Sequence, residues 1–210
     1  MKKPLFQIAL EAEQATGKVN KEIEYVFYAR LVDTGILEKA TNKEELEQWE
    51  VRIEKTDENA SSGRIRIRKT IENGETTYVM TTKTLGQYVG ELKKEIEVSN
   101  PSSEDAFKQF KLFAPYGMKK TRYTLPVGQS DLVWEIDIHK LEDDSDSEWV
   151  RIELEVEKEL ETVPQLPDAF QDVIYNQRGS QTEEENKLIE KLYNEVFLAK
   201  NEYLTKETND

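Results

Sequence analysis

Charged side chains recur at every second position in several segments, and each row carries mostly one sign. The basic rows are Arg64, Arg66 and Arg68, then Lys120 and Arg122, with Lys83 alone in its segment. The acidic rows are Glu11 and Glu13, Glu95 and Glu97, Glu135 and Asp137, and Glu153, Glu155 and Glu157. Because residues i and i+2 of a strand lie on the same face, each row would project from one side of a sheet.

The two kinds of row together suit one class of ligand. Converging carboxylates are the ligands of hard divalent cations such as Mg²⁺ or Mn²⁺. Arginine and lysine side chains facing them would neutralise a polyanion, and arginine binds phosphate oxygens in a bidentate geometry. A pocket that carries both rows is therefore matched to a complex of a metal ion with a polyphosphate.

The segments that carry these rows alternate between polar and apolar residues, which is the period of a strand. Turn-forming Gly, Asn, Pro and Ser residues separate them, as consecutive hairpins require. The predicted strands are Trp49–Thr56, Arg64–Thr70, Thr77–Thr84, Lys93–Ser99, Met118–Leu125, Asp131–Lys140 and Trp149–Leu160.

Apolar residues at helical spacing and capping signals predict helices between and after the strands. Capping boxes at Thr41-x-x-Glu44 and Thr182-x-x-Glu185 open a short helix towards Trp49 and a long last helix. The other predicted helices are Asn20–Thr34, which Gly35 would cap, Glu104–Phe113 and the short Asp168–Tyr175.

The N-terminal stretch Leu5–Glu13 is compatible with a strand or a helix. If it is a helix, residues 21–31 (KEIEYVFYARL) become the first strand instead. The capping signal at Gly35 favours the strand at Leu5–Glu13, which gives about eight strands.

Two arrangements of these strands are possible. In an ordinary antiparallel sheet the helices would cover the apolar face and the charges would lie in water. A sheet closed into a barrel would turn the charged rows inward and place the helices outside. Like charges at i and i+2 on strand after strand favour closure, because solubility alone does not require them. We therefore predict an α+β fold: a closed eight-stranded antiparallel β-barrel, or tunnel, with a charged interior and helices packed outside.

Composition limits the class of protein. The chain of 210 residues fits one domain, residues 1–210, with residues 161–210 as a helical extension packing on the barrel. The net charge of −14 disfavours extended binding to nucleic acid. We see no run of ~18 apolar residues for a membrane span and no secretory signal. The absence of cysteine suits the cytoplasm, where we expect the protein.

In order along residues 5–160, these short patterns resemble the triphosphate tunnel metalloenzymes, which include CYTH-type phosphatases and fungal and viral RNA 5′-triphosphatases. The matching pieces are Glu11-Ala-Glu13, Arg66-Ile-Arg68, Thr81-Thr-Lys83, Lys93-x-Glu95-x-Glu97, Lys120-Thr-Arg122-Tyr123, Glu135-Ile-Asp137 and Glu153-Leu-Glu155. Each piece alone is a weak signal, and their order along the chain strengthens it.

The resemblance implies metal-dependent hydrolysis of a triphosphate, with Mg²⁺ or Mn²⁺ as cofactor. The substrate would be a nucleoside triphosphate, inorganic triphosphate or an RNA 5′ end. The implied metal ligands are Glu11, Glu13, Glu95, Glu97, Glu153 and Glu155. Glu135 and Asp137 would orient or deprotonate the attacking water, and Arg64, Arg66, Arg68, Lys83, Lys120 and Arg122 would hold phosphate.

One position departs from the family pattern, in which the first strand usually reads Glu-x-Glu-x-Lys/Arg. The basic position is Ala15 here, or Val26 if the acidic pair is Glu22 and Glu24. A module that binds a nucleotide or polyphosphate without cleaving it is therefore an alternative, as is a class IV-type nucleotide cyclase that keeps the tunnel and releases pyrophosphate.

Overall fold

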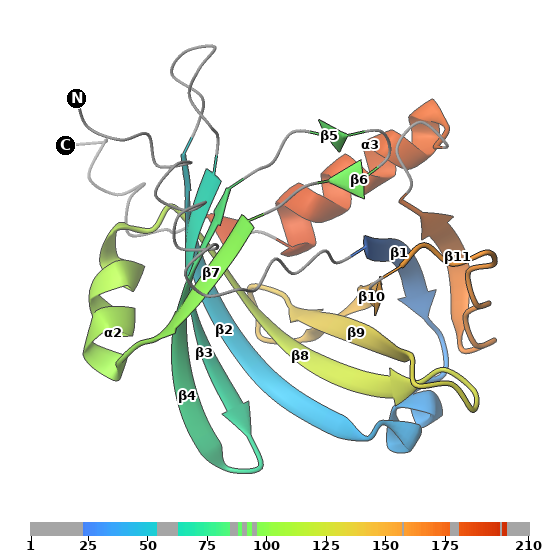
Figure 1. The fold of residues 1–210 in the computed structure, drawn as a ribbon, viewed down its shortest axis with the longest axis horizontal. Helices are drawn as coiled ribbons and strands as arrows, with labels where there is room; N and C mark the ends of the chain where they lie inside the picture. The colour runs from blue at the N-terminus through green and yellow to red at the C-terminus, as the bar shows by residue number, and fades with distance from the viewer. Residues whose placement is uncertain are drawn as a thin grey trace.

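A curled antiparallel sheet dominates the protein (Figure 1). The computed structural model describes residues 23–53, 63–84, 88–89, 92–93, 96–156, 158–176, 181–197 and 199–200. The predicted strand at Leu5–Glu13 lies outside these residues.

Nine strands follow one another across the sheet in the order β11-β1-β10-β9-β8-β2-β3-β4-β7. Their bounds are β1 Ile23–Leu31, β2 Asn42–Ile53, β3 Gly63–Glu72, β4 Glu75–Thr84, β7 Ile96–Pro101, β8 Tyr116–Pro126, β9 Val133–Lys140, β10 Asp146–Val156 and β11 Phe170–Tyr175. The short β12 (Ala199–Lys200) adds to β8, and β5 (Tyr88–Val89) pairs with β6 (Leu92–Lys93) in a separate ladder.

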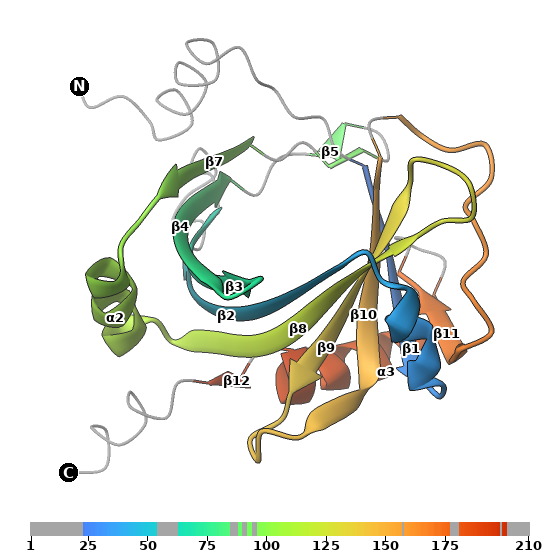
Figure 2. The same ribbon diagram turned by 90° about the horizontal axis from the view of Figure 1, so that it is seen from below.

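The sheet curls so that β4 and β7 stand on one side of an arc and β10 and β1 on the other (Figure 2). Within the residues that the structure describes, no pairing joins the end strands β7 and β11. The prediction of a closed eight-stranded barrel is therefore corrected to a curled sheet whose described path is open.

The alternating segments form strands where the sequence predicts them. The strands β3, β4, β8, β9 and β10 contain their predicted segments, apart from a few residues at the ends. A two-residue turn at Asn73 and Gly74, both with positive φ (50° and 83°), joins β3 to β4 as a tight hairpin turn.

The predicted helix Asn20–Thr34 is wrong, because residues 23–31 form β1. Five consecutive residues of β1, from Tyr25 to Ala29, are buried. A strand covered on both faces is apolar throughout and loses the alternating pattern that marks a half-exposed strand, so its sequence resembles a buried helix.

Two further helix predictions are wrong. The capping box at Thr41 and Glu44 does not open a helix, because residues 42–53 form β2, and residues 170–175 form the end strand β11 instead of a helix. In β2 the buried positions Leu46, Gln48 and Glu50 alternate with more exposed ones. The tertiary pairing of β2 with β3 and β8 overrides the local capping signal.

The helices observed are the 3₁₀-helix η1 (Thr34–Lys39), α2 (Glu104–Phe113), α3 (Glu183–Leu192) and the π-helix η2 (Tyr193–Phe197). The bounds of α2 match the prediction, and the capping box of Thr182 and Glu185 forms at the start of α3. Among the described residues, no helix is long and apolar enough to cross a membrane.

The apolar face of the sheet lies outside the curl. Phe107 and Phe110 of α2 pack on Ile67 and its neighbours, and α2 stands outside the arc of β2, β3 and β4 (Figure 2). On the other half, Trp134, Ile136 and Ile152 form a core that residues 160–170 cover. The opposite face, with the charged rows, is therefore the inner face of the curl.

Candidate anion-binding site

The inner face gathers the charged residues of seven strands because their registers agree. Arg64, Arg66 and Arg68 of β3, together with Lys83 of β4, form what we call the basic row. Arg66 is opposite Glu50 of β2 and Thr81 of β4, and Arg68 is opposite Gln48 and Val79.

Like charges stand directly opposite one another at the end of the basic row. Arg52 of β2 is in register with Arg64, which is in turn in register with Lys83. Like charges in such positions repel and destabilise a sheet. Arg52 pairs with Glu50 and Lys83 pairs with Glu97, so an anion among these side chains would reduce the repulsion that remains around Arg64.

The basic row also has hydrogen-bond donors without acceptors. Within the described part of the chain, the Nε atoms of Arg64, Arg66 and Arg68 are buried and have no hydrogen-bond partner. Burial, with help from the charges of Arg68 and Arg64, lowers the pKa of Arg66 to about 10. Burial, with the charge of Arg122, also lowers the pKa of Arg68. Unsatisfied donors and lowered pKa values both indicate positive charge without enough compensation.

Few described groups compensate the positive charge of the basic row. Glu97 of β7 pairs with Lys83 and lies 3.5 Å from Arg66 Nη2, while Gln48 accepts a hydrogen bond of 3.3 Å from Arg68 Nη2. Burial alone would raise the pKa of Glu97, but the hydrogen bond and charge of Lys83, together with the charge of Arg66, outweigh burial and lower that pKa.

A second group of charges, which we call the paired network, lies on β8, β9 and β10. It contains three cations and three carboxylates: Lys120, Arg122, Arg151, Glu135, Asp137 and Glu153. In register, Asp137 lies between Arg122 and Arg151, while Glu135 lies opposite Glu153, so cations and carboxylates are mixed on these three strands. The paired network is therefore close to neutral by itself.

Arg122 is the centre of the paired network. Its Nε donates to Asp137 Oδ1 over 2.7 Å, and its Nη2 donates to Asp137 Oδ2 over 2.8 Å and to Glu153 Oε2 over 3.0 Å. Its Nη1 donates to Glu135. All three guanidinium nitrogens are thus engaged by protein carboxylates.

The paired network sets the protonation of its members. Burial would raise the pKa of the fully buried Asp137, but Lys120 and Arg122 hold it far below its usual range. Burial, assisted by the Glu153 and Asp137 carboxylates, raises the pKa of Glu135 despite Arg122. A general base must be able to take a proton near neutral pH, so Glu135 suits that role better than Asp137.

Lys120 and His139 complete this wall of the inner face. Burial lowers the pKa of Lys120 to about 8 and that of His139 to about 3, where the charge of Lys120 also contributes. His139 is therefore neutral at physiological pH.

The described carboxylates do not fit a metal site by themselves. No three Asp, Glu or His side chains of the described chain are grouped so that they could hold a metal ion. Glu153 is bound by Arg122 and Arg151, and Glu97 by Lys83 and Arg66. Glu155 is exposed and lies opposite Glu24 of β1. The predicted ligands Glu11, Glu13 and Glu95 lie outside the described residues.

The first strand, β1, has an apolar residue at the position where the family pattern Glu-x-Glu-x-Lys/Arg has a cation. Because β1 begins at Ile23, the acidic position is Glu24, and the position two residues later is Val26. Val26 is buried with Tyr28 and Leu192 in an apolar cluster that includes Leu188 of α3. Apolar side chains of β1 and α3 are thus in contact at this position, where the family pattern has a cation.

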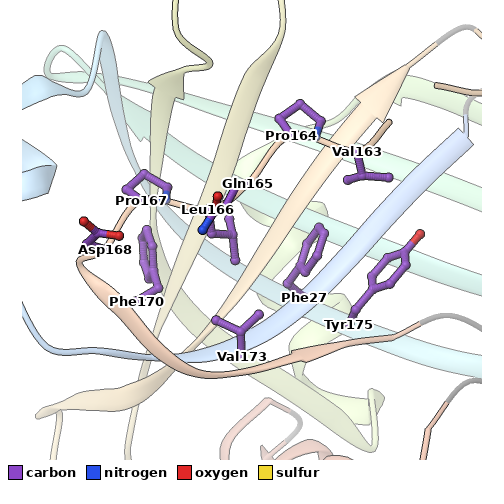
Figure 3. Close-up of a pocket in the computed structure, with 10 residues that line it drawn as sticks. All are labelled: Phe27, Val163, Pro164, Gln165, Leu166, Pro167, Asp168, Phe170, Val173 and Tyr175. Carbon is purple, nitrogen blue, oxygen red and sulfur yellow. The ribbon is translucent and has the colours of Figure 1, made fainter. Parts of the chain in front are cut away.

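A separate apolar hollow of about 350 Å³ lies between β1, β11 and residues 163–168 (Figure 3). Phe27 and Tyr175 stack with ring centroids 4.8 Å apart at its wall. Phe27 belongs to the apolar outer face, so this hollow does not join the charged site.

The search for rows of one sign does not identify two cations of the inner face, Arg52 and Arg151. Arg52 shares its face with Glu50, and Arg151 shares its face with Glu153 and Glu155. Each follows the same two-residue spacing, but its sign differs from that of its row. Strand parity without the requirement of equal sign would have found both.

Comparisons with known proteins add limited information. No family model matches the chain, and no curated protein matches it. The PH1819 protein from Pyrococcus horikoshii is similar in structure with a TM-score of 0.43 and 20% identity, over 65% of this chain and 80% of that one.

Another similar structure is the HpAC1 protein from Hippeastrum, a proposed adenylyl cyclase with a dominant triphosphatase activity. It has a TM-score of 0.38 and 10% identity, over 81% of this chain and 86% of that one. A conserved hypothetical protein from Pyrococcus furiosus has a TM-score of 0.39 and 19% identity, over 63% and 77% of the two chains. Similarity at this level assigns no function, which must be argued from the site itself.

Proposed function

We propose that the protein binds a triphosphate group on its inner face and hydrolyses it with the help of a divalent metal ion. The observation that carries the proposal is the basic row, in which three neighbouring arginines have buried Nε donors without acceptors in the described chain. A polyanion would supply both the missing acceptors and the missing negative charge.

Binding requires cations that are free to turn to the ligand. The three arginines of the basic row, with their Nε atoms unpartnered in the described chain, meet this requirement better than Arg122, whose guanidinium is engaged on all three nitrogens. We therefore assign the main phosphate contacts to Arg64, Arg66, Arg68 and Lys83. Lys120 and Arg122 lie on β8, which β2 separates from β3, and the charge of Arg122 contributes to lowering the pKa of Arg68.

Hydrolysis requires a group that can orient or deprotonate water. Glu135 is the best placed of the described carboxylates, because its side chain is 25% exposed and its pKa is raised. Asp137 would act through Arg122 and Lys120, which it holds in place.

The proposed metal is Mg²⁺ or Mn²⁺, which would offset the charge that develops on the phosphate oxygens. Its proposed ligands are Glu153 and Glu155, with Glu97 and with Glu11, Glu13 and Glu95 from outside the described residues. Since the described carboxylates do not form that site alone, we derive no step through the metal.

Binding without hydrolysis is the second candidate function. The burial of Val26 in an apolar cluster favours it, because no cation of β1 is then available to stabilise charge at this position. The capture of Glu153 by two arginines also favours it.

The deciding experiment measures phosphate and pyrophosphate release from inorganic triphosphate, ATP and a 5′-triphosphorylated RNA. Each substrate is tested with Mg²⁺, with Mn²⁺ and with a chelator. We expect metal-dependent phosphate release that Glu155→Ala abolishes while the melting temperature is kept. Asp144→Asn, which removes an exposed charge paired with Lys119 and tolerates the positive φ of 62° at this position, is the matched control.

Each outcome selects one function. Phosphate release that Glu155→Ala leaves unchanged would reject the metal assignment. Tight binding without release would select the binding module, and pyrophosphate with a cyclic nucleotide as products would identify a cyclase.

A further inference from the structure

Arg52 occupies the end of the basic row, although it comes from a different strand. It lies in register with Arg64, and Arg64 lies in register with Lys83. Directly opposed side chains on one face have their Cβ atoms about 5 Å apart. A phosphate group that contacts Arg64 is therefore within reach of the Arg52 guanidinium.

Four contacts fix the Arg52 guanidinium in one orientation. Its Nε donates to Glu50 Oε1 over 2.9 Å, and its Nη2 donates to the Tyr193 hydroxyl over 2.5 Å. Its Cζ lies 5.2 Å from the ring centroid of Tyr116 and 5.4 Å from that of Tyr193.

These contacts leave one donor group available. Among the hydrogen bonds within the described chain, none uses Nη1 of Arg52. The side chain is 40% exposed, whereas its partner Glu50 is 3% exposed. Arg52 thus combines a buried anchor with an accessible donor, which is the arrangement of a preorganised ligand contact.

A purely structural role explains the geometry less well. Arg52 joins β2 to η2 through Glu50 and Tyr193, but this structural role does not require a place directly opposite another arginine, where like charges repel. An anion between Arg52, Arg64 and Lys83 would turn that repulsion into attraction.

We propose that Arg52 is a further phosphate-binding residue, held in its binding orientation by Glu50 and by Tyr193 of η2. The proposal rests on the proposed function and extends the basic row from two strands to three. Tyr193 is then a positioning residue through which the segment after α3 supports the site.

The test measures the Kd of inorganic triphosphate without metal by calorimetry, for the wild type and for Arg52→Gln, Tyr193→Phe and Arg66→Gln. We expect Arg52→Gln to raise Kd about 10- to 100-fold, as for loss of a charge-assisted hydrogen bond. Tyr193→Phe keeps the ring and removes the hydroxyl, so we expect a rise of about 3- to 10-fold. Lys119→Gln, on the outer face of β8, is the control for one lost positive charge.

The outcomes separate this inference from the proposed function. An unchanged Kd for Arg52→Gln, with a raised Kd for Arg66→Gln, would overturn the role of Arg52 and leave the proposed function intact. A lower melting temperature with unchanged Kd would show that Arg52 only anchors η2. If the wild type does not bind triphosphate, both proposals fail. If Arg52→Gln does not fold, the Kd of Tyr193→Phe decides, and an unchanged value overturns the inference.

Discussion

The basic row and the paired network lie on the same inner face but differ in how their charges are compensated. In the paired network, Arg122 and Asp137 make hydrogen bonds of 2.7 and 2.8 Å, and every carboxylate has a cation. In the basic row, three arginines keep buried Nε atoms without partners in the described chain. Similar residue types on neighbouring strands can thus serve structure in one place and ligand binding in another.

The difference follows from the order of charges across the strands. On β8, β9 and β10 the register places Asp137 between two arginines. On β2, β3 and β4 it places Arg64 between Arg52 and Lys83. Asp137 compensates the cations on both sides of it, whereas Arg64 lies between two cations whose carboxylate partners, Glu50 and Glu97, belong to β2 and β7.

The largest expected effect is the loss of a carboxylate from the paired network. Asp137→Ala would leave the buried Lys120 without the carboxylate it pairs with and remove two hydrogen bonds of Arg122, so we expect a loss of about 3–5 kcal/mol in the free energy of unfolding. Urea denaturation at pH 7 measures it. Asp144→Asn, which breaks the exposed ion pair with Lys119 and tolerates the positive φ at this position, should change little. Equal effects of the two variants would show that the network does not stabilise the fold.

A smaller effect of opposite sign is expected from the basic row. Arg66→Gln removes one of several repelling charges, so we expect the ligand-free protein to gain up to about 1 kcal/mol of stability. The same variant should bind triphosphate about 10-fold or more weakly. Thermal unfolding with and without inorganic triphosphate measures both quantities. A destabilised ligand-free variant would show that the basic row is compensated after all.

A third expected effect is a pH dependence of stability that originates in the paired network. The pKa values of Asp137 and Glu153 are lowered in the folded protein, Asp137 by Lys120 and Arg122 and Glu153 mainly by Arg151, against the effect of burial. Their stabilisation is therefore complete above about pH 5 and is lost as the pH falls towards the folded pKa values. Glu135 has a raised pKa and opposes part of this change.

Urea midpoints measured from pH 6 to pH 3 test this dependence. The midpoint of the wild type should fall with pH, and Asp137→Asn should show a shallower fall from a lower starting value. Parallel curves for the two proteins would exclude Asp137 as a source of the pH dependence.

The sequence predicts those strands and helices that have one buried face and one face exposed to water, because their residues alternate between apolar and polar. The strands β3, β8 and β10 have one apolar and one charged face, and this alternation locates them and their charged rows. The helix α2 has one apolar face and was predicted with its observed bounds.

The elements that the sequence mispredicts lack such a pattern. In β1 both faces are buried, with Phe27 in the outer core and Val26 under α3. Strand pairing also cannot be read from one chain, so neither the register of Arg52 with Arg64 nor the engagement of Arg122 by Asp137 was predictable. The charged rows were identified, but the way in which they compensate one another requires the three-dimensional structure.

The place of β1 in the sheet has a consequence for how the chain folds. The strands β2, β3 and β4 are joined by consecutive hairpins, whereas β1 pairs with β10 and β11 near the other end of the chain. Closing so long a loop slows folding, and during synthesis β1 leaves the ribosome long before its partners exist. We therefore expect the hairpins to form first and the apolar residues 25–29 to be the segment most prone to aggregation in nascent or partly folded chains.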